Sequence, residues 1–255
     1  MERIILGLDD EQASQTALDW VVERSAVHPV SVDVLSVAQT ARDARRLEAT
    51  ARAASERLRS AHSGTSARKT IVVDGSSIPE AVAAAAVAAD LVVIAHHRHR
   101  RVRAALTGWL PLEIAAASPR PVVVVPDDWR RRYGRIVVGL AADGSSDNAV
   151  RFAAAEAIAT GRTLDLVVIE PDYVSVGARM MVETAAEEVR SAHPGIVVRP
   201  LVWAGDRDDA LADACTDASL VVVGSHGRST IESVVVGAVL HRLMAAVTAP
   251  VCAVR

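Results

Sequence analysis

The chain has 255 residues, of which 51% are hydrophobic and 23% charged, with a formal net charge of -3 at pH 7. This is the composition of a folded globular protein, so neither wholesale disorder nor a fibrous repeat is expected. The charge provides no overall basic field and aromatic residues are only 3%, which disfavours a protein that binds nucleic acid or an anionic membrane surface. No apolar run is long enough to span a bilayer.

Short runs of β-branched residues alternate with longer amphipathic or alanine-rich segments along the whole chain. This alternation is typical of a parallel sheet covered by helices on both faces. Because crossovers are right-handed, each half predicts a doubly wound, five-stranded α/β sheet in the order 3-2-1-4-5. We expect strands at residues 3–8, 30–37, 69–73, 91–95 and 122–125, then at 135–140, 164–170, 196–202, 220–224 and 251–254, with helices between them.

The second half of the chain repeats the first. The run Arg3–Leu8 recurs as Arg135–Leu140, and Leu91–Ala95 recurs as Leu220–Gly224 at nearly the same offset along the chain. An internal repeat of this length predicts two copies of one domain in tandem.

A polar, charged segment separates the two copies. It follows Pro126 and runs over residues 127–134, a composition that indicates a linker. The predicted domains are residues 1–126 and 135–255. The cytoplasm is the expected compartment, because two cysteines are too few for a disulfide framework and the first strand run begins at Arg3 without a leader.

The predicted strand order places a crevice between strands 1 and 4 of each half. Ligands of open α/β sheets bind at such a switch point, outside the carboxyl ends of the strands. The strongest local signal there is Gly224-Ser-His-Gly227, followed after nine residues by Gly237-Ala238, which we expect to open the last helix. Glycines let amides approach a ligand and a helix N-terminus adds donors for phosphate, although glycines also serve simply to shape a loop.

These features together resemble the universal stress protein family. The resemblance rests on the duplicated units, on Gly-Leu-Asp9 at the end of the first strand, and on Gly224-x-x-Gly227 with Gly237, and it covers essentially the whole chain. It implies a Rossmann-like fold of the adenine nucleotide alpha hydrolase type and a regulatory role in the stress response. In that family the glycine pattern, completed by Gly-Ser/Thr, marks members that bind ATP, and the Asp contacts the base or ribose side.

The family motif is divided between the two halves. The second half keeps its glycines but has Ala238 at the hydroxyl position and Ala141 in place of the acid, whereas the first half keeps Asp9 but has Ala95 and Arg98 at glycine positions. We therefore expect weak adenine-nucleotide binding in the second half and a closed or altered pocket in the first. The predicted nucleotide-binding residues are Gly139, Leu140, Ala141, Gly224, Ser225, His226, Gly227, Arg228, Gly237 and Ala238, and a degenerate first site would comprise Asp9, His96, Arg98 and Gly108.

The loop that replaces the first glycine motif is the densest basic run of the chain, His96–Arg103. Three interpretations stay open for it: a solvated charged loop, side chains that hold an anion or a nucleotide phosphate, and a His-rich metal site.

No hydrolase signature is present in the sequence. An enzyme is therefore not expected, or at most a slow ATPase, with ATP bound weakly or not at all and Mg²⁺ only as a companion of the nucleotide. The alternative is a nucleotide-free module that acts through its surface or through dimerisation. The duplicated chain resembles a dimer joined by a linker, with Val122–Val125 and Val251–Val254 as its expected contact strands, and a homodimer of whole chains is a further expectation.

Overall fold

The computed structural model describes residues 1–9, 13–73, 77–96, 110–141, 146–224 and 230–255. The chain divides into two compact units, Met1–Arg130 (unit 1) and Arg131–Arg255 (unit 2). This division falls inside the segment that the sequence predicted as a linker.

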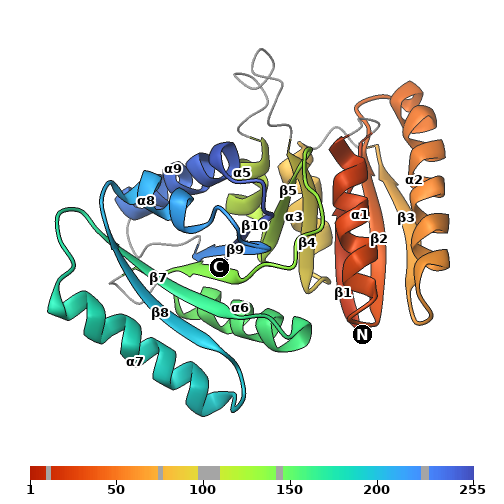
Figure 1. Cartoon of the computed structure of the whole chain (residues 1–255). Coiled ribbons are helices and arrows are strands. Elements are labelled where there is room, and N and C mark those ends of the chain that lie inside the picture. The colour runs from red at the N-terminus through yellow and green to blue at the C-terminus, as the bar shows by residue number, and fades with distance from the viewer. Residues whose placement is uncertain (10–12, 74–76, 97–109, 142–145, 225–229) are drawn as a thin grey trace. The chain divides into compact units, whose positions relative to one another are not determined.

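Unit 1 is a parallel sheet in the order β3-β2-β1-β4-β5 (Figure 1). Its elements are β1 (Glu2–Gly7), α1 (Ala13–Ser25), β2 (Val30–Val37), α2 (Ala41–Ala61), β3 (Ser66–Val72), α3 (Ile78–Ala86), β4 (Leu91–His96), α5 (Leu110–Ala117) and β5 (Val122–Pro126). The predicted strand order is confirmed for this unit.

Unit 2 repeats the topology, with a parallel sheet in the order β8-β7-β6-β9-β10. Its elements are β6 (Ile136–Gly139), α6 (Asp147–Thr160), β7 (Leu164–Glu170), α7 (Val176–Ala192), β8 (Val198–Ala204), α8 (Arg207–Ala214), β9 (Leu220–Gly224), α9 (Thr230–Ala246) and β10 (Val251–Val254). Numbered within the unit, this is again the order 3-2-1-4-5, so both halves confirm the predicted fold class.

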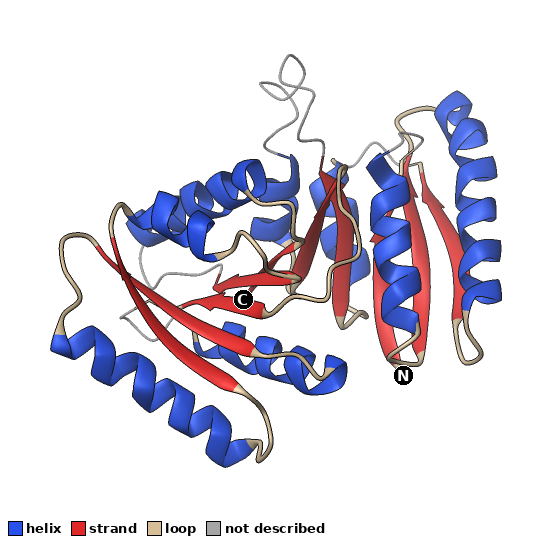
Figure 2. Cartoon of the chain, in the orientation of Figure 1, coloured by secondary structure: helices blue, strands red, loops and turns tan. Residues whose placement is uncertain are grey.

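Helices cover both faces of each sheet (Figure 2). In unit 1, α1 packs with α2 on one face and α3 with α5 on the other, and in unit 2, α8 packs with α9 on the face opposite α6 and α7. The central strands are buried on both sides, and their side chains are almost all Val, Ile and Leu. Continuous apolar runs are what a strand covered on both faces requires, which is why these strands were visible in the sequence.

Two strands differ from their predicted bounds by more than one residue at an end. β3 begins at Ser66, earlier than expected, because Ser66, Ala67 and Arg68 continue the pairing with β2. β8 is shifted towards the C-terminus. Gly195 before it has φ +99° and the Ile196 amide donates to the His193 carbonyl at 3.3 Å, so this segment forms a turn, and pairing with β7 extends to Ala204 instead.

An ion cluster crosses the amino ends of the strands in unit 2. The Asp165 carboxylate on β7 is 1% exposed and accepts hydrogen bonds from Nε and Nη2 of Arg199 on β8 at 2.7 and 2.6 Å. Arg135 Nε lies 2.8 Å from the same carboxylate, in a direction that makes the contact an ion pair rather than a hydrogen bond. The hydrogen bond to Asp165 raises the pKa of the Arg199 guanidinium.

Unit 1 carries a simpler version of this cluster. Asp33 and Arg68 are register partners on β2 and β3, as Asp165 and Arg199 are on β7 and β8, and Arg68 Nη2 lies 2.7 Å from Asp33 Oδ2. The other carboxylate oxygen of Asp33 is buried without a hydrogen-bond partner. Unit 1 has therefore kept the acid–arginine pair, but Arg3, the counterpart of Arg135, lies 3.6 Å from the Asp90 carboxylate instead.

Among the described helices, none has the length and apolar character needed to cross a bilayer.

Candidate functional site

A cavity of about 120 Å³ lies at the carboxyl ends of the strands of unit 1. It sits beside β1 and β4, which pair with each other although they are separated in the chain by β2 and β3, so it occupies the switch point at which open α/β sheets bind ligands. Its walls come from β1, α1, β2, α3, β4 and α5. Most of the lining is aliphatic, with Leu35, Val82, Ile94 and Ile114 among its residues, and Asp9 and Ser14 are also part of it.

Asp9 is held at the rim of this cavity by the first turns of α1. The Asp9 amide donates to Ser14 Oγ at 3.2 Å, and Ser14 Oγ donates to Asp9 Oδ1 at 2.6 Å. Ser14 is buried, so the pair ties Asp9 to the start of α1. The arrangement places a carboxylate against an otherwise apolar hollow.

Gly7 is needed where the cavity meets the sheet. A Cβ at this position would lie 3.0 Å from Ile94 Cγ2 on β4, closer than real Cβ atoms normally approach a neighbour. The small residue therefore lets the end of β1 lie close to Ile94, which itself lines the cavity.

The corresponding strand end in unit 2 keeps the contact to a serine but lacks the carboxylate. The Ala141 amide donates to Ser146 Oγ at 2.9 Å, which repeats the contact between the Asp9 amide and Ser14. The Leu140 amide donates to the Val167 carbonyl at 2.8 Å. These backbone contacts of the strand end are thus present where the acid is absent.

A leucine stands against the strand end in unit 2. A Cβ built on Gly139 would lie 3.3 Å from Leu211 Cδ2, and Leu211 is buried. In the alignment of the two repeats that pairs Leu91 with Leu220, Leu211 on α8 corresponds to Val82 on α3, which lines the cavity in unit 1. The larger side chain occupies more of the space beside β6 than valine does beside β1.

The structure brings some of the predicted residues together. Gly139 and Gly224 end the neighbouring strands β6 and β9, and Asp9 and His96 follow or end the neighbouring strands β1 and β4. Six predicted residues lie outside the described residues: Arg98, Gly108, Ser225, His226, Gly227 and Arg228.

The prediction that Gly237 opens the last helix is wrong. α9 begins at Thr230, so Gly237 and Ala238 lie in its interior. A single glycine inside a helix costs only about 1 kcal/mol relative to alanine, which a helix of this length tolerates. Amides in a helix interior donate to carbonyls four residues earlier, so Gly237 does not belong to the unpaired amides of the helix N-terminus.

The expectation that the pocket of unit 1 is closed or altered stays a prediction, because Arg98 and Gly108 lie outside the described residues. A cavity of about 120 Å³ is present among the described residues of this unit. Sequence reasoning missed its aliphatic lining, since the lining comes from several elements and no local pattern marks it.

The model of the universal stress protein family matches the chain twice, over residues 1–126 and 132–255. The chain belongs to the universal stress protein family. A universal stress protein of Mycolicibacterium smegmatis is 23% identical, over 99% of this chain and 96% of its own length.

Solved structures agree on the fold. A universal stress protein from Archaeoglobus fulgidus DSM 4304 superimposes with a TM-score of 0.79 at 16% identity, covering 100% of this chain and 96% of that one. A putative universal stress protein from Pseudomonas aeruginosa UCBPP-PA14 gives a TM-score of 0.72 at 15% identity, covering 100% and 93%. The chain is thus similar over its whole length to proteins of the same Rossmann-like α/β fold.

Proposed function

We propose that this universal stress protein is a regulatory protein that binds an adenine nucleotide, with the base in the cavity of unit 1. The observation that carries the proposal is the aliphatic hollow at the switch point with the Asp9 carboxylate at its rim. A flat, largely apolar ring suits such a lining, and a carboxylate is a natural acceptor for ribose hydroxyls. Membership of the family makes an adenine nucleotide the ligand class to test first.

The size of the cavity limits what it can hold. Pockets that enclose a whole drug-sized ligand measure about 300–1,000 Å³, so a hollow of about 120 Å³ is suited to one ring and not to a complete nucleotide. The phosphates would then extend outward, towards the point where the chain leaves β4 at His96 and returns at Leu110. The basic run that follows His96 in the sequence lies outside the described residues, and we propose its cations as phosphate contacts in place of the amides of a glycine loop.

The site predicted in unit 2 stays a prediction and ranks second. Leu211 beside Gly139 and the absence of an acid at Ala141 both favour a weaker site, as does the helical position of Gly237. These three features also favour the alternative in which unit 2 has become a nucleotide-free interaction module. The buried thiols of Cys215 and Cys252 fit the reducing cytoplasm, where we propose the protein to act.

Isothermal titration calorimetry with ATP tests the proposal on four proteins: the wild type, Ala95→Trp, Asp9→Ala and Gly227→Arg. Ala95 is half-buried at the mouth of the cavity, so tryptophan should fill it and abolish binding. Loss of a hydrogen bond to a charged group costs about 1.5–3 kcal/mol, so Asp9→Ala should weaken binding roughly 10- to 150-fold. Gly227→Arg should leave the affinity unchanged.

A matched control is Ala117→Trp, an exposed alanine at the end of α5 outside the cavity lining, which should bind ATP like the wild type. If Gly227→Arg abolishes binding and Ala95→Trp does not, the ligand belongs in unit 2 and our assignment is wrong. If the wild type binds no nucleotide at all, the interaction module is the correct reading of both units.

A further inference from the structure

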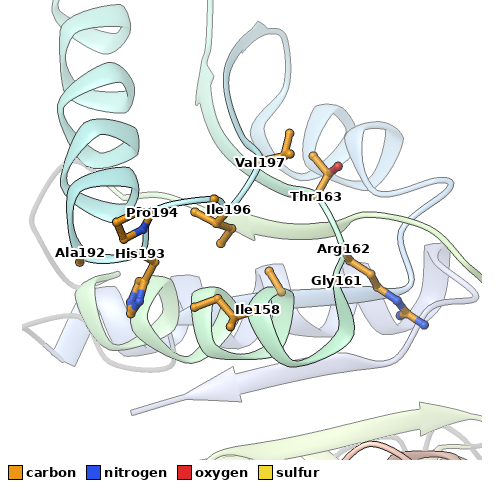
Figure 3. A pocket seen from close by; sticks show the side chains of 11 residues that line it. Ile158, Gly161, Arg162, Thr163, Ala192, His193, Pro194, Ile196 and Val197 are labelled. Carbon is orange, nitrogen blue, oxygen red and sulfur yellow. The ribbon is translucent and has the colours of Figure 1, made fainter.

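A second and larger hollow lies in unit 2, at the amino ends of two of its strands. It measures about 520 Å³ and is formed by the C-terminal ends of α6 and α7 and by the residues that lead into β7 and β8 (Figure 3). This volume falls within the range of about 300–1,000 Å³ found for small-molecule pockets. It is at the amino ends of the strands, away from the switch point.

Two glycines keep the backbone beside the hollow open. Gly161 caps α6 with φ +64° and Gly195 follows α7 with φ +99°, and a Cβ at either position would meet nothing within 4 Å. In unit 1 the counterpart of Gly195 is Gly64, where a Cβ would meet Pro29 Cβ at 3.9 Å. The open space therefore belongs to the sequence of unit 2 and is not imposed by the shared fold.

The length of α6 explains part of this difference. In the alignment of the two repeats that pairs Arg3 with Arg135, the end of α1 at Ser25 corresponds to Ala157, but α6 continues to Thr160 before Gly161 ends it. The added residues extend α6 past the position at which α1 ends, and Ile158 is one of them. Ile158 then becomes one wall of the hollow.

Apolar side chains face this space while still exposed to solvent. Ile158 is 49% exposed and Val197 is 60% exposed, and Ile196 is half-buried. Figure 3 shows Ile158 on α6 and Ile196 on the wall across from it, with His193 and Thr163 nearer the two ends. Covering such surface contributes about 25 cal/mol per Å², so an apolar ligand seated here gains by displacing water.

The charges around the hollow select against anions. Both helices end here, and the C-terminal ends of helices carry partial negative charge that disfavours an anion and not a cation. None of the described residues that line the hollow is Asp or Glu, so no carboxylate is present to form an ion pair with a cation. The side chain of Arg162 points away from the space in Figure 3, which leaves the Thr163 hydroxyl and the His193 imidazole as the polar side chains nearest to it.

We propose that this hollow of unit 2 binds a small, mainly aliphatic molecule that carries no negative charge. Its apolar body lies between Ile158 and Ile196, and one polar group reaches the hydroxyl or imidazole at an end. The site is independent of the nucleotide proposal, because it shares no residue with the cavity of unit 1.

The test uses the full chain with ¹³C-labelled isoleucine methyl groups, titrated with 1-hexanol, hexanoate and hexylammonium. These probes share one aliphatic chain and differ in charge. We expect saturable chemical-shift changes at Ile158 and Ile196 but not at Ile136 or Ile169, which serve as internal references in the same unit. Since a helix C-terminus disfavours an anion by about 0.3–1 kcal/mol, hexanol should bind roughly two- to fivefold more tightly than hexanoate, and hexylammonium should not show this loss.

Two variants locate the binding. Ala192 is an exposed residue of the hollow, and Ala192→Trp should weaken hexanol binding at least about tenfold. Glu183→Trp places the same side chain on α7, at an exposed position outside the lining, and should bind hexanol like the wild type. Absent shifts at Ile158 and Ile196, hexanoate binding as tight as that of hexanol, or unchanged hexanol binding in Ala192→Trp would each overturn the proposal.

Discussion

Replacing Asp165 with asparagine should destabilise unit 2 far more than the matching change in unit 1. Asp165 is buried and its carboxylate contacts both Arg199 and Arg135. Removing one partner of a buried ion pair typically costs about 3–5 kcal/mol. Arg199 is 51% exposed and can be rehydrated, whereas Arg135 is only 25% exposed. We therefore expect a loss near the lower end of that range, about 3 kcal/mol.

Asp33→Asn is the matched control. Asp33 has a single arginine partner, Arg68, whose side chain is 77% exposed, and pairs of this kind contribute roughly 0–1 kcal/mol. One Asp33 oxygen already lacks a hydrogen-bond partner, so the substitution removes less. We expect a cost of about 1 kcal/mol.

The two variants can be compared by calorimetric melting together with hydrogen exchange of the peptides that cover β6, β7 and β8. For a unit of this size, 1 kcal/mol corresponds to roughly 3–4 °C, so the Asp165 variant should lower the transition of unit 2 by about 10 °C and the Asp33 variant should lower that of unit 1 by about 3–4 °C. Exchange should accelerate in β6–β8 only for the Asp165 variant. Equal shifts for the two variants would refute the argument that the second arginine and the deeper burial decide the cost.

Further predictions concern the buried thiol of Cys215 and two glycines, Gly134 and Gly177. Burial raises the pKa of Cys215 from 9.0 to about 12, so the folded state keeps its proton where the unfolded state loses it. The resulting stability is complete below pH 9 and is lost as the pH rises towards 12. From pH 8 to 10.5, urea unfolding should show that the free energy of unfolding of the wild type falls by about 2 kcal/mol more than that of Cys215→Ala. Equal decreases in the two proteins would contradict this. Gly134→Ala should destabilise by about 2 kcal/mol or more, because its Cβ would collide with the Asp217 carbonyl oxygen. Gly177→Ala in α7, where the space is ordinary, should be neutral or slightly stabilising. Thermal melting checks both, and similar melting temperatures for the two would disprove the steric argument.

The fold was predictable because each strand is marked by a short apolar run in the sequence. Runs such as Val122–Val125 and Leu164–Val168 are largely apolar, as strands covered on both faces must be, and the repeat supplied each strand twice. The ends of the strands were less predictable. The start of β3 depends on pairing with β2, and the start of β8 depends on a turn at Gly195, neither of which follows from hydrophobicity alone.

The candidate site was less predictable than the fold. Asp9 could be singled out because it follows a strand, but the cavity beside it is assembled from six elements, and the depth of a hollow depends on side chains that are distant in sequence. The Gly237 prediction failed because a motif glycine was taken for a helix start, whereas the helix begins at Thr230 and runs through it. The pairing of Asp165 with Arg199 could have been found, since Asp33 and Arg68 recur at equivalent strand positions.

Ser14 and Ser146 bond the backbone of their loops whether the residue at the strand end is Asp9 or Ala141. The serine hydroxyl therefore accepts this hydrogen bond whether or not the residue at the strand end is acidic. That residue can change with little effect on the fold. A gene duplication that preserves such an anchor allows one copy to retain its ligand while the other drifts towards a different task inside an unchanged scaffold.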